Sequence, residues 1–266
     1  MNRKIMRIAL WSLSSIALVA LFSFVNVRRN HLTCTGALVN IMGDTSLRFV
    51  NELELLELMR EKGCEYLNTP LDKIDTRKIE VALITHPAIA EADVYLTIDG
   101  VLKADVRQRE PVLRIIDQIG DSYYIDTNGD YMPLSESFTP MIPVATGAIT
   151  DPWPKYTRNI QEIMKNDSIQ SIAIVDDLYA IAKALRADTL LSAQLLQLYV
   201  RPDKDIEMIA RVGPEIILFG NKSNLEKKVR NLKLFYSRAM NEPVVEQYTM
   251  LNLKYQNQII CTKITQ

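Results

Sequence analysis

The sequence predicts an α+β protein with a single N-terminal transmembrane helix, a small domain of strand–helix–helix–strand–strand order, and a second mixed α/β-sheet domain. Three observations predict this architecture. They are an uncharged stretch near the N-terminus, two helix-start signals followed by an Asp-Gly turn, and alternating apolar segments that continue to the C-terminus. With 266 residues, 48% of them hydrophobic, the chain is long enough for two modest domains with cores of their own.

The N-terminal stretch, residues 8–27, contains no charged residue and has about the length of 20 residues that a helix needs to cross a bilayer. Basic residues flank it on both sides, and Trp11 lies near its first boundary, as an interfacial aromatic would. A cleaved signal peptide would have a shorter apolar region and a small-x-small cleavage site, which "FVNVRRNH" does not offer. We therefore predict an uncleaved anchor with a cytoplasmic tail at 1–7, a transmembrane helix at 8–27 and a juxtamembrane linker at 28–36.

The small domain is predicted over residues 37–110. "ALVNIMGD" is typical of a short strand, and Asn51 with Glu54 forms a capping pattern for a helix that Gly63 ends. The apolar stripe of this helix is predicted at Leu53, Leu56, Leu58 and Met59. Asp75 caps a second helix with an inward face of Ile79, Ala82 and Leu83. Strands at 89–98 and 101–110 are joined at Asp99–Gly100, a strong hairpin signal, which gives three strands covered on one face by two helices.

The junction between the domains is predicted in "VRQREPVL", residues 106–113. Pro111 has no backbone donor, so the preceding strand should end there. Arg107 and Arg109 are interpreted as solvent-side charges on one strand face. Together with Glu110 and Pro111 they form a short, stiff crossing, which would fix the relative orientation of the two domains.

The second domain is predicted over residues 111–266. It contains a hairpin with a turn at Asn128–Gly129, an amphipathic helix with Ile174, Leu178, Ile181, Ala182 and Leu185 inward, and strands at 193–200, 205–212 and 215–220. Ser223 and Glu226 predict a capping box for a helix whose Leu225, Val229, Leu232 and Tyr236 face one way. Residues 246–264 form one alternating segment with a polar break at Gln256–Asn257. It is predicted as a single strand, either at a sheet edge or in the interior.

The chain lacks the common patterns of catalysis. It contains no phosphate-binding glycine loop, no G-x-S-x-G and no H-E-x-x-H. Asp176 and Asp177 are adjacent on a helix, point in different directions, and are explained by the helix macrodipole. "DTNGD" is interpreted as a turn rather than a calcium loop. We therefore predict no enzymatic activity.

No metal site, cofactor or nucleic-acid partner is predicted either. The 31 basic residues nearly cancel the 32 acidic ones, which argues against a nucleic-acid binder. Cys34, Cys64 and Cys261 are widely spaced without a C-x-x-C, so neither a zinc site nor a redox dithiol is indicated. A disulfide between two of them stays open.

Four stretches resemble the bacterial cell-division protein family FtsQ/DivIB: "VYLTIDGVLKADVRQREPVLRI", "YYIDTNGDYMPL", "PEIILFG" and "MLNLKYQNQII". The last stretch has Asn252 and Lys254 where the family usually carries Asp and Arg. The resemblance implies that the small domain is a POTRA module and the second an FtsQ-type β domain. It further implies a non-enzymatic divisome scaffold in the bacterial inner (cytoplasmic) membrane. The protein would cross the membrane once (type II), with its N-terminus cytoplasmic and its bulk periplasmic, and would concentrate at the division septum.

The resemblance also implies partners and a site. The POTRA module would recruit division proteins, and the terminal strand would bind FtsB/FtsL-like coiled-coil membrane proteins, with septal cell-wall synthesis proteins in the same complex. Binding would occur by strand addition. The partner-binding residues implied are Tyr248, Met250, Leu251, Asn252, Leu253, Lys254 and Tyr255. The alternative is a POTRA-bearing accessory of envelope protein transport or outer-membrane biogenesis.

Overall fold

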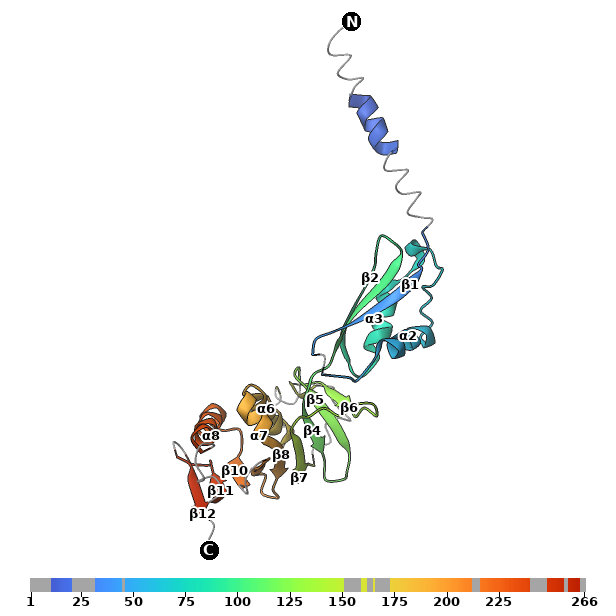
Figure 1. Ribbon diagram of the computed structural model, residues 1–266. Helices are drawn as coiled ribbons and strands as arrows, with labels where there is room; N and C mark the ends of the chain where they lie inside the picture. The colour runs from blue at the N-terminus through green and yellow to red at the C-terminus, as the bar shows by residue number, and fades with distance from the viewer. Residues whose placement is uncertain are drawn as a thin grey trace. The chain divides into compact units, whose positions relative to one another are not determined.

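The computed structural model describes residues 11–20, 32–44, 46–150, 159–161, 165, 173–211, 216–239, 248–255 and 258–263. Residues 11–20 form a helix (Figure 1). Its apolar side chains are exposed, among them Trp11 and Ile16. The predicted span at 8–27 extends past this helix at both ends, into residues outside the described ranges. Within those ranges, no helix combines the length and the apolar character needed to cross a membrane. The chain divides into two compact units, the first ending at Gln108 and the second beginning at Arg109.

The first unit has the predicted order of strand, helix, helix, strand, strand, with one added 3-10 turn. Its sheet has the order β1-β3-β2, with β1 parallel and β2 antiparallel to β3. Helix α2 contacts β1, and α3 contacts both β2 and α2 (Figure 1). The elements are β1 (Gly36–Met42), α2 (Glu52–Glu61), η1 (Leu71–Lys73), α3 (Thr76–Ile84), β2 (Ile89–Leu96) and β3 (Val101–Gln108).

Both predicted helix starts are confirmed. Asn51 Oδ1 accepts a hydrogen bond from the backbone N of Glu54 at 2.9 Å, and Asp75 Oδ1 accepts one from the backbone N of Lys78 at 3.0 Å. These bonds satisfy amide groups that have no partner inside the helix.

The predicted inward face of α3 is confirmed, and that of α2 is confirmed at Met59 but wrong at Leu53. Leu55 and Met59 are buried, whereas Leu53 is 74% exposed. Residues four apart share one helix face, so the pair at 55 and 59 faces the core while position 53 lies on the other side. In a helix this rich in leucine, the hydrophobic pattern alone does not fix the buried face.

The end of β3 is held by Gln108, a buried polar side chain that is 4% exposed. Its Oε1 accepts a hydrogen bond from Phe49 N at 2.9 Å, and its Nε2 donates to Leu47 O at 3.1 Å. The last residue of the first unit is thus bonded to the segment before α2. Only Arg109 and Glu110 lie between β3 and the next strand.

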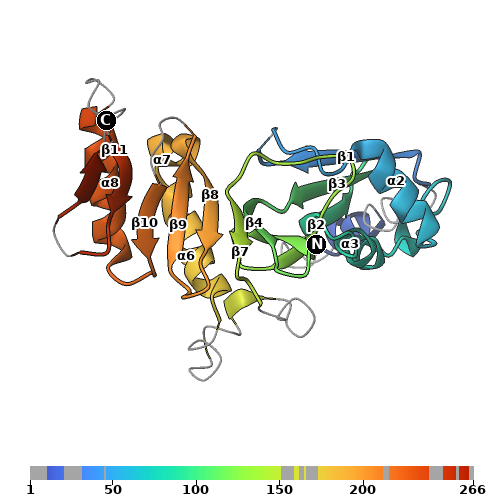
Figure 2. The same cartoon turned by 90° about the horizontal axis from the view of Figure 1, so that it is seen from below.

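The second unit is built on a nine-stranded mixed sheet of order β12-β11-β10-β9-β8-β7-β4-β5-β6 (Figure 2). The pairs β4–β7, β7–β8 and β10–β11 are parallel and the others antiparallel. The strands are β4 (Pro111–Ile116), β5 (Ser122–Asp126), β6 (Tyr131–Pro133), β7 (Val144–Gly147), β8 (Leu195–Val200), β9 (Ile206–Ala210), β10 (Ile216–Gly220), β11 (Tyr248–Asn252) and β12 (Ile260–Lys263). The helices are α6 (Val175–Arg186), α7 (Thr189–Gln194) and α8 (Leu225–Ala239).

The core of the second unit lies between this sheet and its helices. The apolar stripe predicted for α6 is confirmed, since Ile174, Leu178, Ile181, Ala182 and Leu185 are all buried. Leu232 and Tyr236 of α8 are buried as predicted, and Leu225 and Val229 pack against the same core. Gly147 lies so close to β8 that a Cβ there would come within 2.2 Å of Val200 O, so only glycine fits between these strands.

Two predicted details of the second unit are wrong, and one helix was not predicted. Helix α8 begins at Leu225, after Asn224 with a φ of 56°, so Ser223 lies two residues before the helix and is not its N-cap. The short helix α7 was not expected, because six residues carry too little periodicity to be recognised. Residues 246–264 do not form one strand: β11 and β12 pair antiparallel, so the chain turns back between them. The polar break at Gln256–Asn257 lies outside the described residues.

Candidate partner-binding site

Strand β11 lies inside the sheet. It pairs with β10 on one side and with β12 on the other, and Leu251 stands opposite both Ile217 and Cys261. The pairing with β10 continues past the strand end, where Leu253 N donates to Leu218 O at 2.9 Å. The backbone groups of β11 are therefore used on both sides, and this strand offers no free edge.

The edge at this end of the sheet belongs to β12. In the described part of the chain, no strand pairs with its outer side. Ile260 is 43% exposed and Thr262 and Lys263 are exposed, whereas Cys261 is half-buried and packs against the core. This alternation leaves β12 with one face on the core and one open edge of unpaired N–H and C=O groups.

The opposite edge of the sheet is less suited to strand addition. Strand β6 has only three residues and ends in Pro133, which pairs with Tyr123 of β5. Proline has no N–H to donate, and short strands with proline are a common protection of sheet edges. Strand β12 contains no proline. The two ends of the sheet thus differ in their capacity to accept another strand.

The structure places the seven predicted partner-binding residues in different environments. Leu251 and Leu253 are 0% and 2% exposed and belong to the core. The ring of Tyr248 lies 6.4 Å from that of Phe235 on α8, and Met250 and Asn252 are half-buried. Lys254 and Tyr255 remain exposed beyond the strand end.

The sequence left open whether this segment is an edge strand or an interior strand. In the structure, β11 is an interior strand. The expectation of an edge at residues 248–255 is corrected: the edge lies at β12. Sequence reasoning missed β12 because its alternation continues that of β11, and only the polar break between them signalled a turn.

The sheet end next to β11 is braced by lysines. Lys228 of α8 is 8% exposed, and its Nζ donates to Phe219 O and Asn221 O, each at 2.8 Å. Desolvation by burial lowers the pKa of Lys228. Lys254 pairs with Asp205, and this hydrogen bond raises the pKa of Lys254. Lys228 thus ties α8 to the end of β10, and Lys254 ties the chain after β11 to the start of β9.

Asp176 and Asp177 have a different role from the one predicted. Asp176 is fully buried and pairs with Lys222 Nζ, which also lies 3.0 Å from Asp177 Oδ1. Burial lowers the pKa of Lys222, but the hydrogen bonds with both carboxylates outweigh this and the net shift is upward. The two carboxylates thus converge on one cation that joins α6 to the loop after β10. The two carboxylates therefore stabilise a tertiary contact, in addition to their favourable interaction with the helix dipole.

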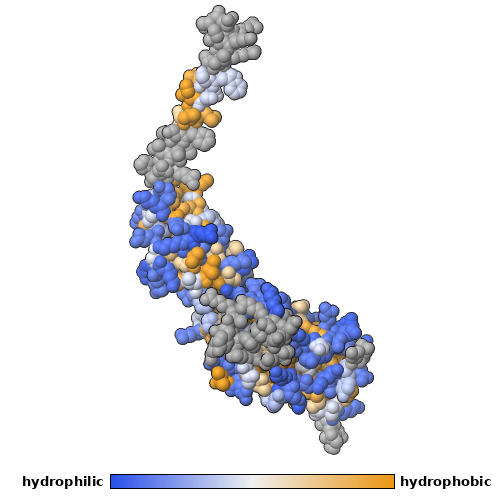
Figure 3. Space-filling view, turned by 180° about the vertical axis from the view of Figure 1, so that it is seen from behind, coloured by the Kyte–Doolittle hydropathy of each residue, from blue (hydrophilic) through white to orange (hydrophobic). Residues whose placement is uncertain are grey.

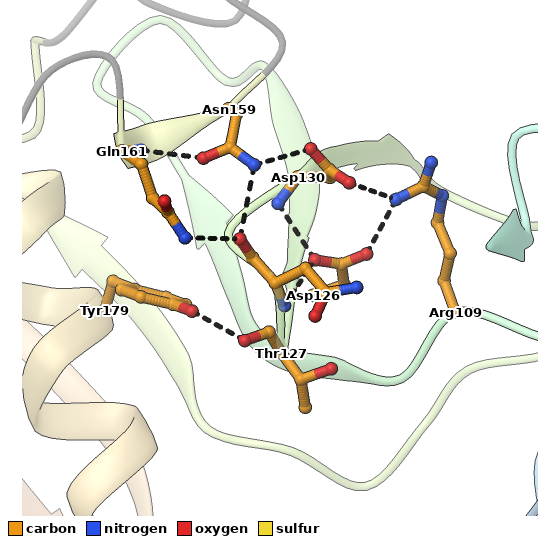
Figure 4. Close-up of polar contacts among 8 residues, drawn as sticks. Arg109, Asp126, Thr127, Asp130, Asn159, Gln161 and Tyr179 are labelled. Carbon is orange, nitrogen blue, oxygen red and sulfur yellow. Dashed lines mark hydrogen bonds and ion pairs between the residues drawn. The ribbon is translucent and has the colours of Figure 1, made fainter.

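Arg109, predicted as a solvent-side charge, is instead held in the second unit. Its side chain is 20% exposed, and Nη1 donates to Asp126 Oδ2 and to Asp130 Oδ2, each at 2.7 Å (Figure 4). Burial lowers the pKa of Arg109, but the hydrogen bonds with Asp130 and Asp126 raise it by more than burial lowers it. The pKa of Arg109 is therefore above its ordinary value. Arg107, by contrast, is 52% exposed in a pair with Glu91, as expected for a surface charge.

The other two junction residues are also bound within the second unit. Glu110 pairs with Arg186 at 2.7 Å, and Arg186 Nη1 donates to Pro111 O at 3.2 Å. Pro111 is the first residue of β4, a position where its missing N–H is tolerated. Arg109 and Glu110 were predicted as the end of the small domain but belong to the second unit. Their partners were not predicted, because these come from distant parts of the chain.

The turn at residues 126–130 is fixed from several sides (Figure 4). Asp126 Oδ1 accepts from Asn128 N and Asp130 N at 2.9 Å each, which closes the turn on itself. Asn159 Nδ2 donates to Asp130 Oδ1 at 2.7 Å, and Tyr179 OH donates to Thr127 O at 2.8 Å. Arg109 compensates the two carboxylates, so this cluster acts as a brace of the fold.

The chemistry of a metal site is not assembled in the part of the chain that the structure describes: no three His, Cys, Asp or Glu side chains are grouped to hold an ion there. Cys34, Cys64 and Cys261 are free thiols. Among the described residues of the second unit, the outer side of β12 offers backbone groups of the kind that an extended peptide segment can pair with.

Comparison with known families agrees with this architecture. The family described as FtsQ/DivIB, C-terminal related, matches residues 110–262, more than half of the chain. The POTRA-like domain family matches residues 32–107. None of the curated proteins with which the sequence was compared matches it.

Proposed function

The chain belongs to the FtsQ/DivIB family, and we propose that it is a membrane-anchored, non-enzymatic scaffold of the bacterial cell-division complex. Membership indicates a role in cell division, and proteins of this family are generally not enzymes. The observation that supports a scaffold is the open edge of β12, because it offers a backbone to a partner segment. The POTRA-like unit would recruit further division proteins.

The proposed organisation follows the sequence. Residues 1–7 would form a cytoplasmic tail, residues 8–27 would span the inner membrane, and residues 28–36 would link the span to the POTRA module. That module was predicted over 37–110 and the FtsQ-type β domain over 111–266, with the boundary in the structure after Gln108. The exposed apolar helix at 11–20 supports an anchor. The folded units would then lie in the periplasm of a single-pass type II protein, concentrated at the septum.

The proposed partner site is the edge of β12 together with the exposed side chains just beyond β11. An FtsB/FtsL-like coiled-coil protein would place an extended segment beside β12, and its main-chain hydrogen bonds would supply affinity. Tyr255, 53% exposed in the chain between β11 and β12, would contribute an aromatic contact. Septal cell-wall synthesis proteins would join through the assembled complex.

The cellular test is the position of the full chain in dividing cells. A fluorescent fusion of the scaffold should concentrate at midcell before constriction. An accessory of envelope transport or outer-membrane biogenesis would give a uniform signal around the envelope instead. A uniform signal in cells with visible septa would contradict the divisome assignment.

The partner site is tested by Tyr255→Glu, with Leu134→Glu as a matched control. Leu134 is 40% exposed and follows β6 at the other end of the sheet. Tyr255→Glu should weaken pull-down of an FtsB-like partner about tenfold or more, as expected for an aromatic residue within an interface. Leu134→Glu should leave binding unchanged. Equal binding by both variants would exclude Tyr255 from the site.

A further inference from the structure

The first unit has one end at which the chain enters it, formed by three segments that lie side by side. Leu32 O accepts from Leu71 N at 3.1 Å, and Asn68 N donates to Cys34 O at 2.8 Å. On the other side, Thr35 N donates to Gly100 O at 2.9 Å. Residues 32–35 therefore run between the 67–71 segment and the turn that joins β2 to β3.

Each of these three segments exposes a large apolar side chain. Leu32 is 39% exposed, Leu67 is 59% exposed and Ile98 is 95% exposed. We call Leu32, Leu67 and Ile98 the apolar tip. Figure 3 shows hydrophobic surface at this end of the unit. Apolar residues scattered singly on a surface are ordinary, but three on adjoining segments at one end form a patch.

The fold does not require isoleucine at the turn. Gly100 has a φ of 86°, which explains the glycine, and Thr97 Oγ1 accepts from Val101 N at 3.0 Å, which explains the threonine. Ile98 stands between them with almost its whole side chain in solvent. A polar residue would serve this turn equally well, so the isoleucine points to a contact outside the unit.

The length of chain before the tip limits what that contact can be. Five residue steps separate Val27, the last residue of the proposed span, from Leu32. An extended chain covers at most about 3.6 Å per residue, so Leu32 lies within about 18 Å of the hydrocarbon edge. The headgroup layer occupies roughly 5–8 Å of that distance. Leu32 is therefore held close to the lipid surface, and Leu67 and Ile98 lie on the two segments that adjoin residues 32–35.

We propose that the apolar tip inserts into the lipid headgroup region and seats the first unit against the membrane. This inference rests on the proposed transmembrane anchor. Glu65 and Asp99, the charged residues nearest in sequence to Leu67 and Ile98, are acidic and exposed, so these two segments bring no attraction to anionic lipids. The ligand is the apolar boundary of the headgroup layer, and zwitterionic phosphatidylcholine should suffice.

The experiment uses the full chain in phosphatidylcholine nanodiscs, with acyl chains brominated near the carbonyl end to quench tryptophan. Trp11 and Trp153 are the native tryptophans. Ile98→Trp is introduced together with Trp11→Phe and Trp153→Phe, so that all tryptophan emission comes from position 98. The matched control is Met42→Trp in the same background, since Met42 is 40% exposed at the far end of β1. Six residue steps along β1 place it about 20 Å from Gly36, which adjoins the tip.

Brominated lipid should reduce the emission of the Ile98→Trp chain by about half or more and leave that of the Met42→Trp chain nearly unchanged, because only the tip reaches the headgroup layer. A chain that keeps Trp11 and carries Trp153→Phe reports the anchor separately. Quenching of Trp11 without quenching at position 98 would overturn the tip contact and leave the anchor intact. No quenching at either position would overturn the anchor and, with it, the contact. Leu67→Trp gives a second reading of the tip and should be quenched to the same extent as Ile98→Trp.

Discussion

Arg109 is the residue on which the start of the second unit depends. One guanidinium nitrogen donates to Asp126, which is 1% exposed, and to Asp130. Removing a charge that compensates a buried carboxylate leaves the carboxylate desolvated without a partner. The neighbouring Arg107 makes an ion pair with Glu91, but both side chains are more than half exposed. Solvent screens such a pair, so it adds little stability.

Arg109→Ala should therefore lower the free energy of unfolding by about 2 kcal/mol, below the range for fully buried pairs because Arg109 and Asp130 are partly solvated. Arg107→Ala should lower it by less than about 0.5 kcal/mol. Urea unfolding of both variants gives the comparison. Equal effects of the two substitutions would mean that the Asp126 cluster does not stabilise the unit.

Asp188 offers a test by pH. It caps α7 by accepting from Leu190 N and Leu191 N at 3.0 and 3.1 Å, and it pairs with Lys233 of α8. The hydrogen bond with Lys233 is the main reason that the pKa of Asp188 lies below its ordinary value of 3.8. A carboxyl whose pKa is lowered by folding stabilises the fold above its unfolded pKa, and this stability is lost as the pH falls through the folded pKa.

Asp188→Ala should accordingly cost about 1 kcal/mol at neutral pH, the usual effect of losing an N-cap. The difference between the parent chain and the variant should shrink as the pH falls below 3.8, where Asp188 of the parent becomes protonated. Thermal unfolding at neutral and acidic pH measures both. Lys233→Met should leave the cap and remove only the ion pair, so a smaller loss is expected. A difference that stays constant with pH would contradict the contribution of the charge.

At the residue scale, the sequence predicted local contacts but not long-range ones. The caps at Asn51 and Asp75 were predictable because a cap depends on residues three positions away. The burial of Arg109 and the pairing of Asp176 with Lys222 were not, because their partners are 17, 21 and 46 residues distant. Only the fold brings such groups together.

At the scale of elements, strands and helices were predicted well where a stripe or a turn signal was present. The hairpins at Asp99–Gly100 and Asn128–Gly129 and the faces of α6 and α8 follow from period and turn chemistry. The β11–β12 hairpin was missed because the two strands share one alternating pattern. This matters for function, since the edge proposed to bind a partner moves from β11 to β12.

Proline substitutions test that edge. Neighbouring residues of a strand direct their N–H groups to opposite sides, so Cys261→Pro and Thr262→Pro remove one donor towards β11 and one donor towards the free side. The variant that loses the donor on the free side should have the same unfolding temperature as the parent chain. It should bind an FtsB-like partner about tenfold less tightly. The other variant should be the less stable of the two.

Thermal unfolding identifies which variant disturbs β11, and a binding titration with the partner gives the affinities. Leu134→Pro, after β6, is the control at the opposite end of the sheet and should bind normally. Full affinity in the variant that keeps parental stability would argue against strand addition at β12.

At the scale of the whole molecule, the two units carry separate cores. Among the described residues, the core of the second unit runs from Val112 of β4 to Leu253 beyond β11 and contains no residue of the first unit. The first unit buries its own set, with Leu55, Ile79, Leu83 and Leu102 among the side chains that are fully or almost fully buried. A unit with its own core and its own hydrogen-bonded sheet can open without the other.

The same substitution in each core tests this independence. Leu83 of α3 and Leu198 of β8 are both fully buried, and truncation of either to alanine should cost its own unit about 2–5 kcal/mol. Hydrogen exchange followed by mass spectrometry on the full chain should show lost protection in peptides of 36–108 for Leu83→Ala. For Leu198→Ala the loss should fall in peptides of 110–252, with the first unit unchanged. Loss of protection throughout the chain from either substitution would mean that the units unfold together. Independent unfolding would instead allow a partner at β12 to stabilise the second unit alone, because a ligand stabilises only the cooperative unit that it binds.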